Sequence, residues 1–87
     1  MKIKENLAYY RKKMNLSFRE LGKLTNINYA TLYYIENGKT PNPQILIINT
    51  LADFFNISLD EFVNVDLKNK NKNMEEIKEG ENTKSAQ

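Results

Sequence analysis

Apolar residues recur at helical spacing over residues 17–25, where Leu21 and Leu24 form one apolar side. Ser17 starts this segment, and Glu20 follows three residues later. In such a pair the hydroxyl accepts a hydrogen bond from a backbone N–H, and the carboxylate accepts one from the backbone N–H of the cap residue. The pattern therefore predicts a helix that begins directly after Ser17.

A second helix is predicted between Asn28, whose side chain can cap it, and Gly38, the residue type that most readily ends a helix in a left-handed conformation. Leu32 and Ile35 form its buried side. Asn26 lies between the two helices, where a short polar side chain tolerates a left-handed backbone. Two short helices joined by such a turn have the form of a helix-turn-helix.

The outer face of the second helix lies opposite its buried residues, because successive residues turn by about 100°. It presents hydroxyl groups, an amide, aromatic rings and one methyl group, and it holds no catalytic pair. These groups suit base edges, thymine methyl groups and phosphate oxygens, although a row of tyrosines also suits a protein interface. The residues of this face are Ala30, Tyr33 and Asn37, flanked by Tyr29 and Tyr34.

Helices are also predicted on both sides of this motif. Before it, apolar residues at spacings of four, three and four predict a helix over about residues 2–14. After it, Asn42 as a cap and Pro43 at the first helical position predict a helix over about residues 43–55. The apolar stripe of the earlier helix is Ile3, Leu7, Tyr10 and Met14, and the core face of the later one is Ile45, Ile48, Leu51, Ala52 and Phe55.

Three apolar residues, Leu46, Ile47 and Phe54, lie outside this core face. They either contact a second copy of the chain or pack against a last short helix. That helix is predicted over residues 58–64, because the Ser-x-x-Glu pattern of a capping box recurs there with apolar residues behind it.

The remaining residues, 65–87, are rich in Lys, Asn and Glu and contain few apolar side chains. Such a segment buries too little surface to offset the entropy lost on ordering, so we expect a disordered tail. The predicted fold is therefore all-α, with a five-helix domain over residues 1–64 and a polar, charged tail over residues 65–87.

A chain of 87 residues is large enough for one domain with one modest core, and small for an enzyme. It contains no Cys and no His, so we expect no disulfide, no metal, no cofactor and no catalysis. No apolar run approaches the roughly 18 residues of a membrane span, and the start of the chain does not resemble a signal peptide. We expect a soluble, cytoplasmic protein with no membrane partner.

The net charge of +2 is unevenly distributed. Residues 1–40 contain eight Lys and Arg against three Glu, which gives a net charge of +5. Residues 41–64 contain three acidic residues and no basic one, and the charges of residues 65–87 cancel. The positive charge coincides with the helix-turn-helix, as a surface that faces phosphates requires. Lysines on ordinary solvated helices would give the same count.

Three motifs accompany this arrangement: Leu-Ser-x-x-Glu-Leu over residues 16–21, Ile-Glu-Asn-Gly-Lys over residues 35–39, and Asn-Ile-Ser-Leu-Asp-Glu-Phe over residues 56–62. With the five predicted helices, residues 3–63 resemble the Cro/C1-type, or Xre-like, helix-turn-helix family of phage and bacterial repressors. The resemblance implies a lambda-repressor-like DNA-binding domain of a transcriptional regulator. Such regulators are generally dimers on palindromic operators, with the second motif helix in the major groove.

The resemblance also implies roles for single residues. Arg11 and Glu36 correspond to an ion pair that joins the first and third helices and supports the fold. Ser17 and Asn28 present helix N-termini to phosphates, where unpaired N–H groups favour an anion. The implied set of DNA-binding residues is Ser17, Asn28, Tyr29, Ala30, Thr31, Tyr33, Tyr34, Asn37, Lys39 and Thr40.

Three features depart from the family pattern. Phe18 stands where the family often has Gln, which removes a common phosphate contact. Asn26 replaces the usual turn glycine at the cost of some strain. Tyrosines replace the more frequent Arg, Ser, Gln or Lys on the outer face, so the face offers no bidentate guanine contact. Operator preference therefore leans toward A·T pairs or DNA shape.

The sequence thus predicts a repressor that occupies a palindromic double-stranded DNA operator as a homodimer, with half-sites about one helical turn apart. The alternative is an adaptor or antirepressor that binds another protein through the tyrosines, Leu46 and Phe54. The positive charge of residues 1–40 favours DNA, and the absence of His, Cys and converging carboxylates argues against an enzyme. A phage, mobile-element, antitoxin or host regulator fits the same residues, as does a further protein partner or effector.

Overall fold

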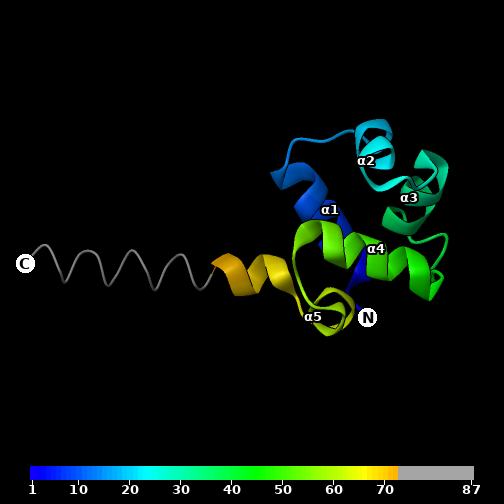
Figure 1. The fold of residues 1–87 in the computed structure, drawn as a ribbon. Helices are drawn as coiled ribbons and strands as arrows, with labels where there is room; N and C mark the ends of the chain where they lie inside the picture. The colour runs from blue at the N-terminus through cyan, green and yellow to red at the C-terminus, as the bar shows by residue number, and fades with distance from the viewer. Residues whose placement is uncertain (73–87) are drawn as a thin grey trace, which may run out of the picture.

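The chain folds into helices joined by short connections in the computed structural model, which describes residues 1–72 (Figure 1). The helices are α1 (Ile3–Lys13), α2 (Phe18–Thr25), α3 (Tyr29–Glu36), α4 (Ile45–Phe55) and α5 (Leu59–Asn64). A further helical segment covers residues 67–72. Every regular element of the described residues is helical. This confirms the predicted all-α fold with the helix-turn-helix at α2 and α3.

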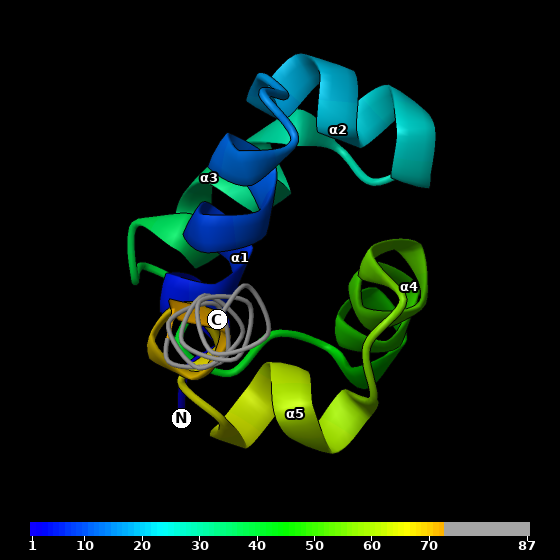
Figure 2. The same cartoon turned by 90° about the vertical axis from the view of Figure 1, so that its left-hand side faces the viewer.

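The core lies where the five labelled helices face a common centre (Figure 2). α1 contacts α3 and α5, α2 contacts α3 and α4, and α4 contacts α5. The burial of apolar side chains at these contacts makes the main contribution to the stability of the fold, and every one of the five helices provides some of them. The buried apolar residues of the five helices are Ile3, Leu7, Leu21, Leu32, Ile35, Ile48, Leu51, Ala52, Phe55 and Phe62.

Both predicted capping boxes are present. At the start of α2, Ser17 Oγ accepts a hydrogen bond from the Glu20 backbone N–H at 3.0 Å, and the Ser17 N–H donates to Glu20 Oε1 at 3.0 Å. Ser58 and Glu61 form the same reciprocal pair at α5. Each box satisfies N–H groups that the first turn of a helix leaves unpaired, so it fixes where that helix begins.

The turn between α2 and α3 brings these two helices close together. Asn26 adopts the predicted left-handed conformation with a φ of 59°, and Asn28 caps α3 by accepting a hydrogen bond from the Ala30 N–H at 2.8 Å. Gly22 is buried, and a Cβ atom there would lie 2.7 Å from the carbonyl oxygen of Ile27. Only glycine therefore allows α2 to approach the turn this closely.

Three residues predicted to lie on apolar faces are exposed instead. Leu24, 59% exposed, is turned by about 200° from the buried Gly22 and so faces away from the core. Met14 lies just past the last residue of α1, where the helical stripe no longer directs its side chain. Ile45, 61% exposed, is the first residue of α4, and Ile48 is the first buried residue of that helix.

α4 also begins two residues later than predicted. Its N-cap is Gln44 rather than Asn42, and Gln44 makes no side-chain cap hydrogen bond. The ψ of 143° at Gln44 is extended, so the linker that contains Pro43 continues up to this residue and the helix starts at Ile45. The proline therefore belongs to the linker and not to the first turn of α4.

The three apolar residues outside the predicted core face of α4 have different surroundings. Ile47 and Phe54 are partly buried and pack against the core. For these two, packing within the domain is the explanation that the structure supports. Leu46 is 75% exposed, so among the three it is the residue that remains accessible to a second chain.

Asn6 ties the first helix to the far end of the domain. Its side chain is fully buried: Nδ2 donates to the carbonyl groups of Phe62 at 2.8 Å and Val65 at 2.7 Å, and Oδ1 accepts the N–H of Leu67 at 3.1 Å. Helical periodicity places Asn6 among the polar residues around the stripe of α1. A pattern of this kind does not separate a buried amide from an exposed one.

Packing continues past the predicted end of the domain. Leu67 is buried, and Lys70 Nζ lies 2.9 Å from Glu61 Oε2 in an exposed ion pair. The buried leucine and the hydrogen bonds to Asn6 order this stretch, although its composition is polar. The rest of the predicted disordered tail, residues 73–87, lies outside the described residues.

Asn6→Ala should lower the free energy of unfolding by about 1–3 kcal/mol, because it leaves a buried N–H, a buried carbonyl group and a part-buried one without their partner. Urea unfolding followed by circular dichroism measures the change. Asn64→Ala is the control, since the exposed Asn64 side chain donates a hydrogen bond to that of Asp60 and to no other group of residues 1–72. Equal stability of the two variants would contradict the role given to Asn6.

Stability should also fall in acid. Hydrogen bonds from Ser17 lower the pKa of Glu20, and the ammonium group of Lys70 together with the Ser58 cap lowers the pKa of Glu61. A carboxylate with a lowered pKa stabilises the fold above its unfolded pKa of about 4.3, and the contribution is lost as pH falls through the folded pKa. The double variant Glu20→Gln/Glu61→Gln should show a smaller stability difference between pH 7 and pH 3 in urea unfolding. An unchanged difference would contradict this.

Candidate nucleic-acid interface

Arg11 of α1 fixes the position of α3. Its Nε donates to Glu36 Oε2 and its Nη2 to Glu36 Oε1, both at 2.7 Å, so the two groups meet in bidentate geometry. Nη1 donates to the carbonyl of Leu16 at 2.9 Å. The Arg11 and Glu36 side chains are only 15% and 9% exposed. Hydrogen bonding to Glu36 raises the pKa of Arg11, although burial opposes this shift. The pair that the family resemblance implies therefore joins α1 to the end of α3.

Phe18 extends this contact to α2. The Arg11 guanidinium lies 4.2 Å from the centroid of the Phe18 ring, and that ring meets Tyr33 of α3 edge-on at 5.6 Å. Tyr33 in turn meets Tyr34 at 5.9 Å. Edge-to-face and cation–π contacts of these lengths are attractive. Phe18, which departs from the family pattern, thus orients the outer face of α3.

The outer face of α3 borders a groove between α2 and α3. Tyr29, Tyr33 and Tyr34 are each between 44% and 46% exposed, and with Ala30 they form one wall. The opposite wall belongs to the start of α2. The groove brings together five of the predicted DNA-binding residues. Its α2 wall is formed by Ser17, Phe18 and Arg19.

Three other predicted residues, Asn28, Thr31 and Asn37, do not line this groove. Asn28 Oδ1 is engaged in capping α3, and Asn37 Nδ2 donates to the carbonyl of Tyr33 at 2.8 Å. Both asparagines are exposed. Thr31 is half-buried and does not line the groove. Asn28 and Asn37 therefore each make a hydrogen bond that supports α3 and are still accessible from solvent, whereas Thr31 lies away from the outer face.

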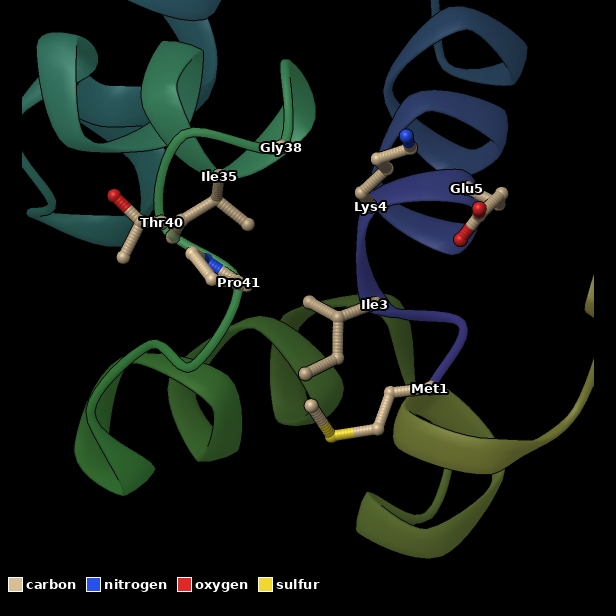
Figure 3. Close-up of a pocket in the computed structure, with 8 residues that line it drawn as sticks. All are labelled: Met1, Ile3, Lys4, Glu5, Ile35, Gly38, Thr40 and Pro41. Carbon is tan, nitrogen blue, oxygen red and sulfur yellow. The ribbon is translucent and has the colours of Figure 1, made fainter.

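The chain turns sharply after α3, at Lys39 and Thr40, which belong to the predicted DNA-binding set. Gly38 has a φ of 76°, and the N–H groups of Lys39 and Thr40 both donate to the carbonyl of Tyr34, at 2.9 and 3.2 Å. Figure 3 shows Lys4 of α1 on the opposite side of a cleft from Thr40. Lys4 Nζ lies 3.6 Å from where a Cβ of Gly38 would be, so Lys4 adds positive charge near the C-terminal end of α3.

Two cations lie against the exposed tyrosines. The Arg19 guanidinium is 4.2 Å from the centroid of the Tyr29 ring, and Lys39 Nζ is 5.7 Å from that of Tyr34. Contacts of this length hold the charges over the ring faces. From the sequence, Arg19 counts only toward the net charge, because spacing rules do not relate residues on different helices. The structure adds Arg19 to the candidate interface.

A family model described as helix-turn-helix matches residues 7–62, which run from α1 to α5 and include both walls of the groove. The chain belongs to the Cro/C1-type helix-turn-helix family. Members carry a DNA-binding domain of transcription regulators, and the family is regulatory rather than catalytic. No curated protein and no solved structure matches the chain. In residues 1–72, no helix is long and apolar enough to cross a membrane, and no acidic side chains cluster as metal ligands would.

In this helix-turn-helix domain, Glu36→Ala should lower the free energy of unfolding by about 2–3 kcal/mol, because it leaves the mostly buried Arg11 charge without its partner. Lys70→Ala, which breaks the exposed pair with Glu61, should cost less than about 1 kcal/mol. Urea unfolding of both variants measures the two losses. A loss at Glu36 no larger than that at Lys70 would contradict the role of the Arg11–Glu36 pair.

Proposed function

We propose that the chain is a transcriptional repressor that binds a palindromic operator in double-stranded DNA as a homodimer, with α3 in the major groove. The observation that carries the proposal is the outer face of α3. It is exposed, rich in hydroxyl groups and flanked by cations, and it lies on a motif whose family binds DNA. A major groove about 12 Å wide admits one α-helix with its side chains.

The chemistry of this face suits base edges. Within residues 1–72, no hydrogen bond engages the hydroxyl groups of Tyr29, Tyr33 and Tyr34, so these groups can donate to or accept from a base or a phosphate. Ala30 offers a methyl group of the size that contacts a thymine methyl. α3 contains no Arg, Lys or Gln, so its direct contacts favour A·T pairs over the bidentate recognition of guanine.

Groups around α3 suit the phosphate backbone. Ser17 and Asn28 mark the N-termini of α2 and α3, where N–H groups and the helix dipole favour an anion. Beyond α3, the backbone bonds to Tyr34 hold Lys39 and Thr40 in a fixed turn, and Lys39 is exposed. Contacts on both sides of α3 would set its depth and angle in the groove, while contacts to the bases would give specificity.

The start of α4 supports the homodimer. Leu46 is 75% exposed and Ile45 is 61% exposed, and they are adjacent apolar residues. A dimer places two copies of α3 about one helical turn of DNA, roughly 34 Å, apart, which produces a palindromic site. Repression then follows from occupancy, because a bound dimer covers the DNA that a polymerase would need.

Selection of bound duplexes from a random DNA pool tests the proposal as a whole. The recovered sequences should be palindromic, with half-site centres about 10 base pairs apart and two chains on each duplex. Recovery of an asymmetric site bound by one chain would contradict the homodimer. Failure to enrich any duplex, together with salt-insensitive binding to a protein, would favour the adaptor instead.

Tyr34→Ala should weaken binding to the selected operator about tenfold or more, because it removes a hydroxyl group and an aromatic surface from the outer face. Gel-shift titration measures the change. Tyr34→Phe isolates the hydroxyl group, and its matched control is Tyr9→Phe, which removes a hydroxyl group on α1 bonded to Asn71. Tyr34 variants that bind as tightly as the Tyr9 control would exclude this face from the interface.

A further inference from the structure

Arg19 and Tyr29 form a unit that joins the two helices of the motif. Arg19 is the second residue of α2 and Tyr29 is the first residue of α3. The guanidinium carbon lies 4.2 Å from the centroid of the tyrosine ring. Both side chains line the groove next to the outer face of α3. The stack therefore stands at the N-terminal end of α3, on the side that faces away from the core.

Gly22 makes this stack possible. It lies three residues after Arg19, so the two residues share one side of α2. Where a Cβ of Gly22 would be, the nearest atoms of Tyr29 are its backbone N at 3.4 Å and its Cα at 3.5 Å. The close approach at Gly22 brings the start of α3 against this side of α2. Tyr29 consequently comes to lie beneath the Arg19 side chain.

The two arginines of the chain are used differently. Arg11 donates three hydrogen bonds, to both oxygens of Glu36 and to the Leu16 carbonyl, while it stacks on Phe18. Arg19 stacks on its ring in the same way, yet within residues 1–72 it forms no ion pair and no hydrogen bond. A stacked guanidinium keeps its N–H groups in its own plane and can direct two of them at the oxygens of one phosphate.

We propose that Arg19 contacts a phosphate of the DNA backbone and that Tyr29 is a positioning residue that holds it there. The inference rests on the proposed function, since it needs DNA in contact with α3. It adds a role for Tyr29: one face of its ring is covered by Arg19, so the ring acts through the arginine. Fixing the arginine before binding reduces the side-chain entropy lost in the complex.

The salt dependence of binding to the selected operator tests the phosphate contact. Each phosphate contact contributes about 0.9 to the slope of log affinity against log salt. Arg19→Ala should reduce the slope by about 1 for each bound chain and weaken binding about tenfold at low salt. The control is Lys68→Ala, which removes an exposed positive charge beside Tyr9 on α1 and should leave the slope unchanged.

The Tyr29 variants test the positioning role. Tyr29→Phe keeps the ring, so it should keep the salt slope of the unmodified chain and lose less affinity than Tyr29→Leu. Tyr29→Leu removes the ring and should weaken binding, and adding Tyr29→Leu to Arg19→Ala should cause little further loss, because the two residues act through one contact. Thermal unfolding of each variant checks that the fold is kept, which the exposure of both residues favours.

Three results would overturn the inference: an unchanged slope in Arg19→Ala, equal losses in Tyr29→Phe and Tyr29→Leu, or additive losses in the double variant. A changed base preference in Arg19→Ala, found by repeating the selection, would overturn the phosphate contact in favour of a base contact. Failure of the unmodified chain to bind any duplex is a different result, because it would overturn the proposed function before any substitution is made.

Discussion

The bidentate pair between Arg11 and Glu36 is the interaction on which the candidate interface depends. A guanidinium group is planar and its donors have fixed directions, so three hydrogen bonds to two segments define how those segments lie. One segment is the end of α3 and the other is the link that leads into α2. The pair therefore sets the geometry of both motif helices relative to α1, and stacking on Phe18 extends this control to the tyrosines.

The inner and outer sides of α3 are supported in different ways. Leu32 and Ile35 are buried in the core, so a change of size there would disturb packing in every neighbouring helix. The outer tyrosines contact mainly one another, Phe18 and the two cations. The candidate DNA-facing surface is thus oriented by aromatic contacts, and Phe18 links these contacts to the core, against which it packs.

Features encoded within a few residues could be predicted from the sequence. Each of these features depends on residues at most three positions apart: the capping boxes at Ser17 and Ser58 and the left-handed turn at Asn26. The helix ends predicted from them agree with the structure. Asn6 could not be predicted as a buried contact, because its partners lie more than fifty residues away. The exposure of Leu24 follows from how α2 approaches α3, which the periodicity of α2 alone does not contain. The contact of Arg19 with the Tyr29 ring could not be predicted for the same reason, since the two residues are on different helices.

The hydrogen bonds of the buried Asn6 amide can form only late in the synthesis of the chain. Its partners are the carbonyl groups of Phe62 and Val65 and the N–H of Leu67, so α1, α2 and α3 emerge from the ribosome before these partners do. Until then, Asn6 keeps water as its hydrogen-bond partner, and the side of α1 that later packs on α5 stays hydrated. The helices of the candidate interface are made first, but the domain closes around them only when Leu67 emerges.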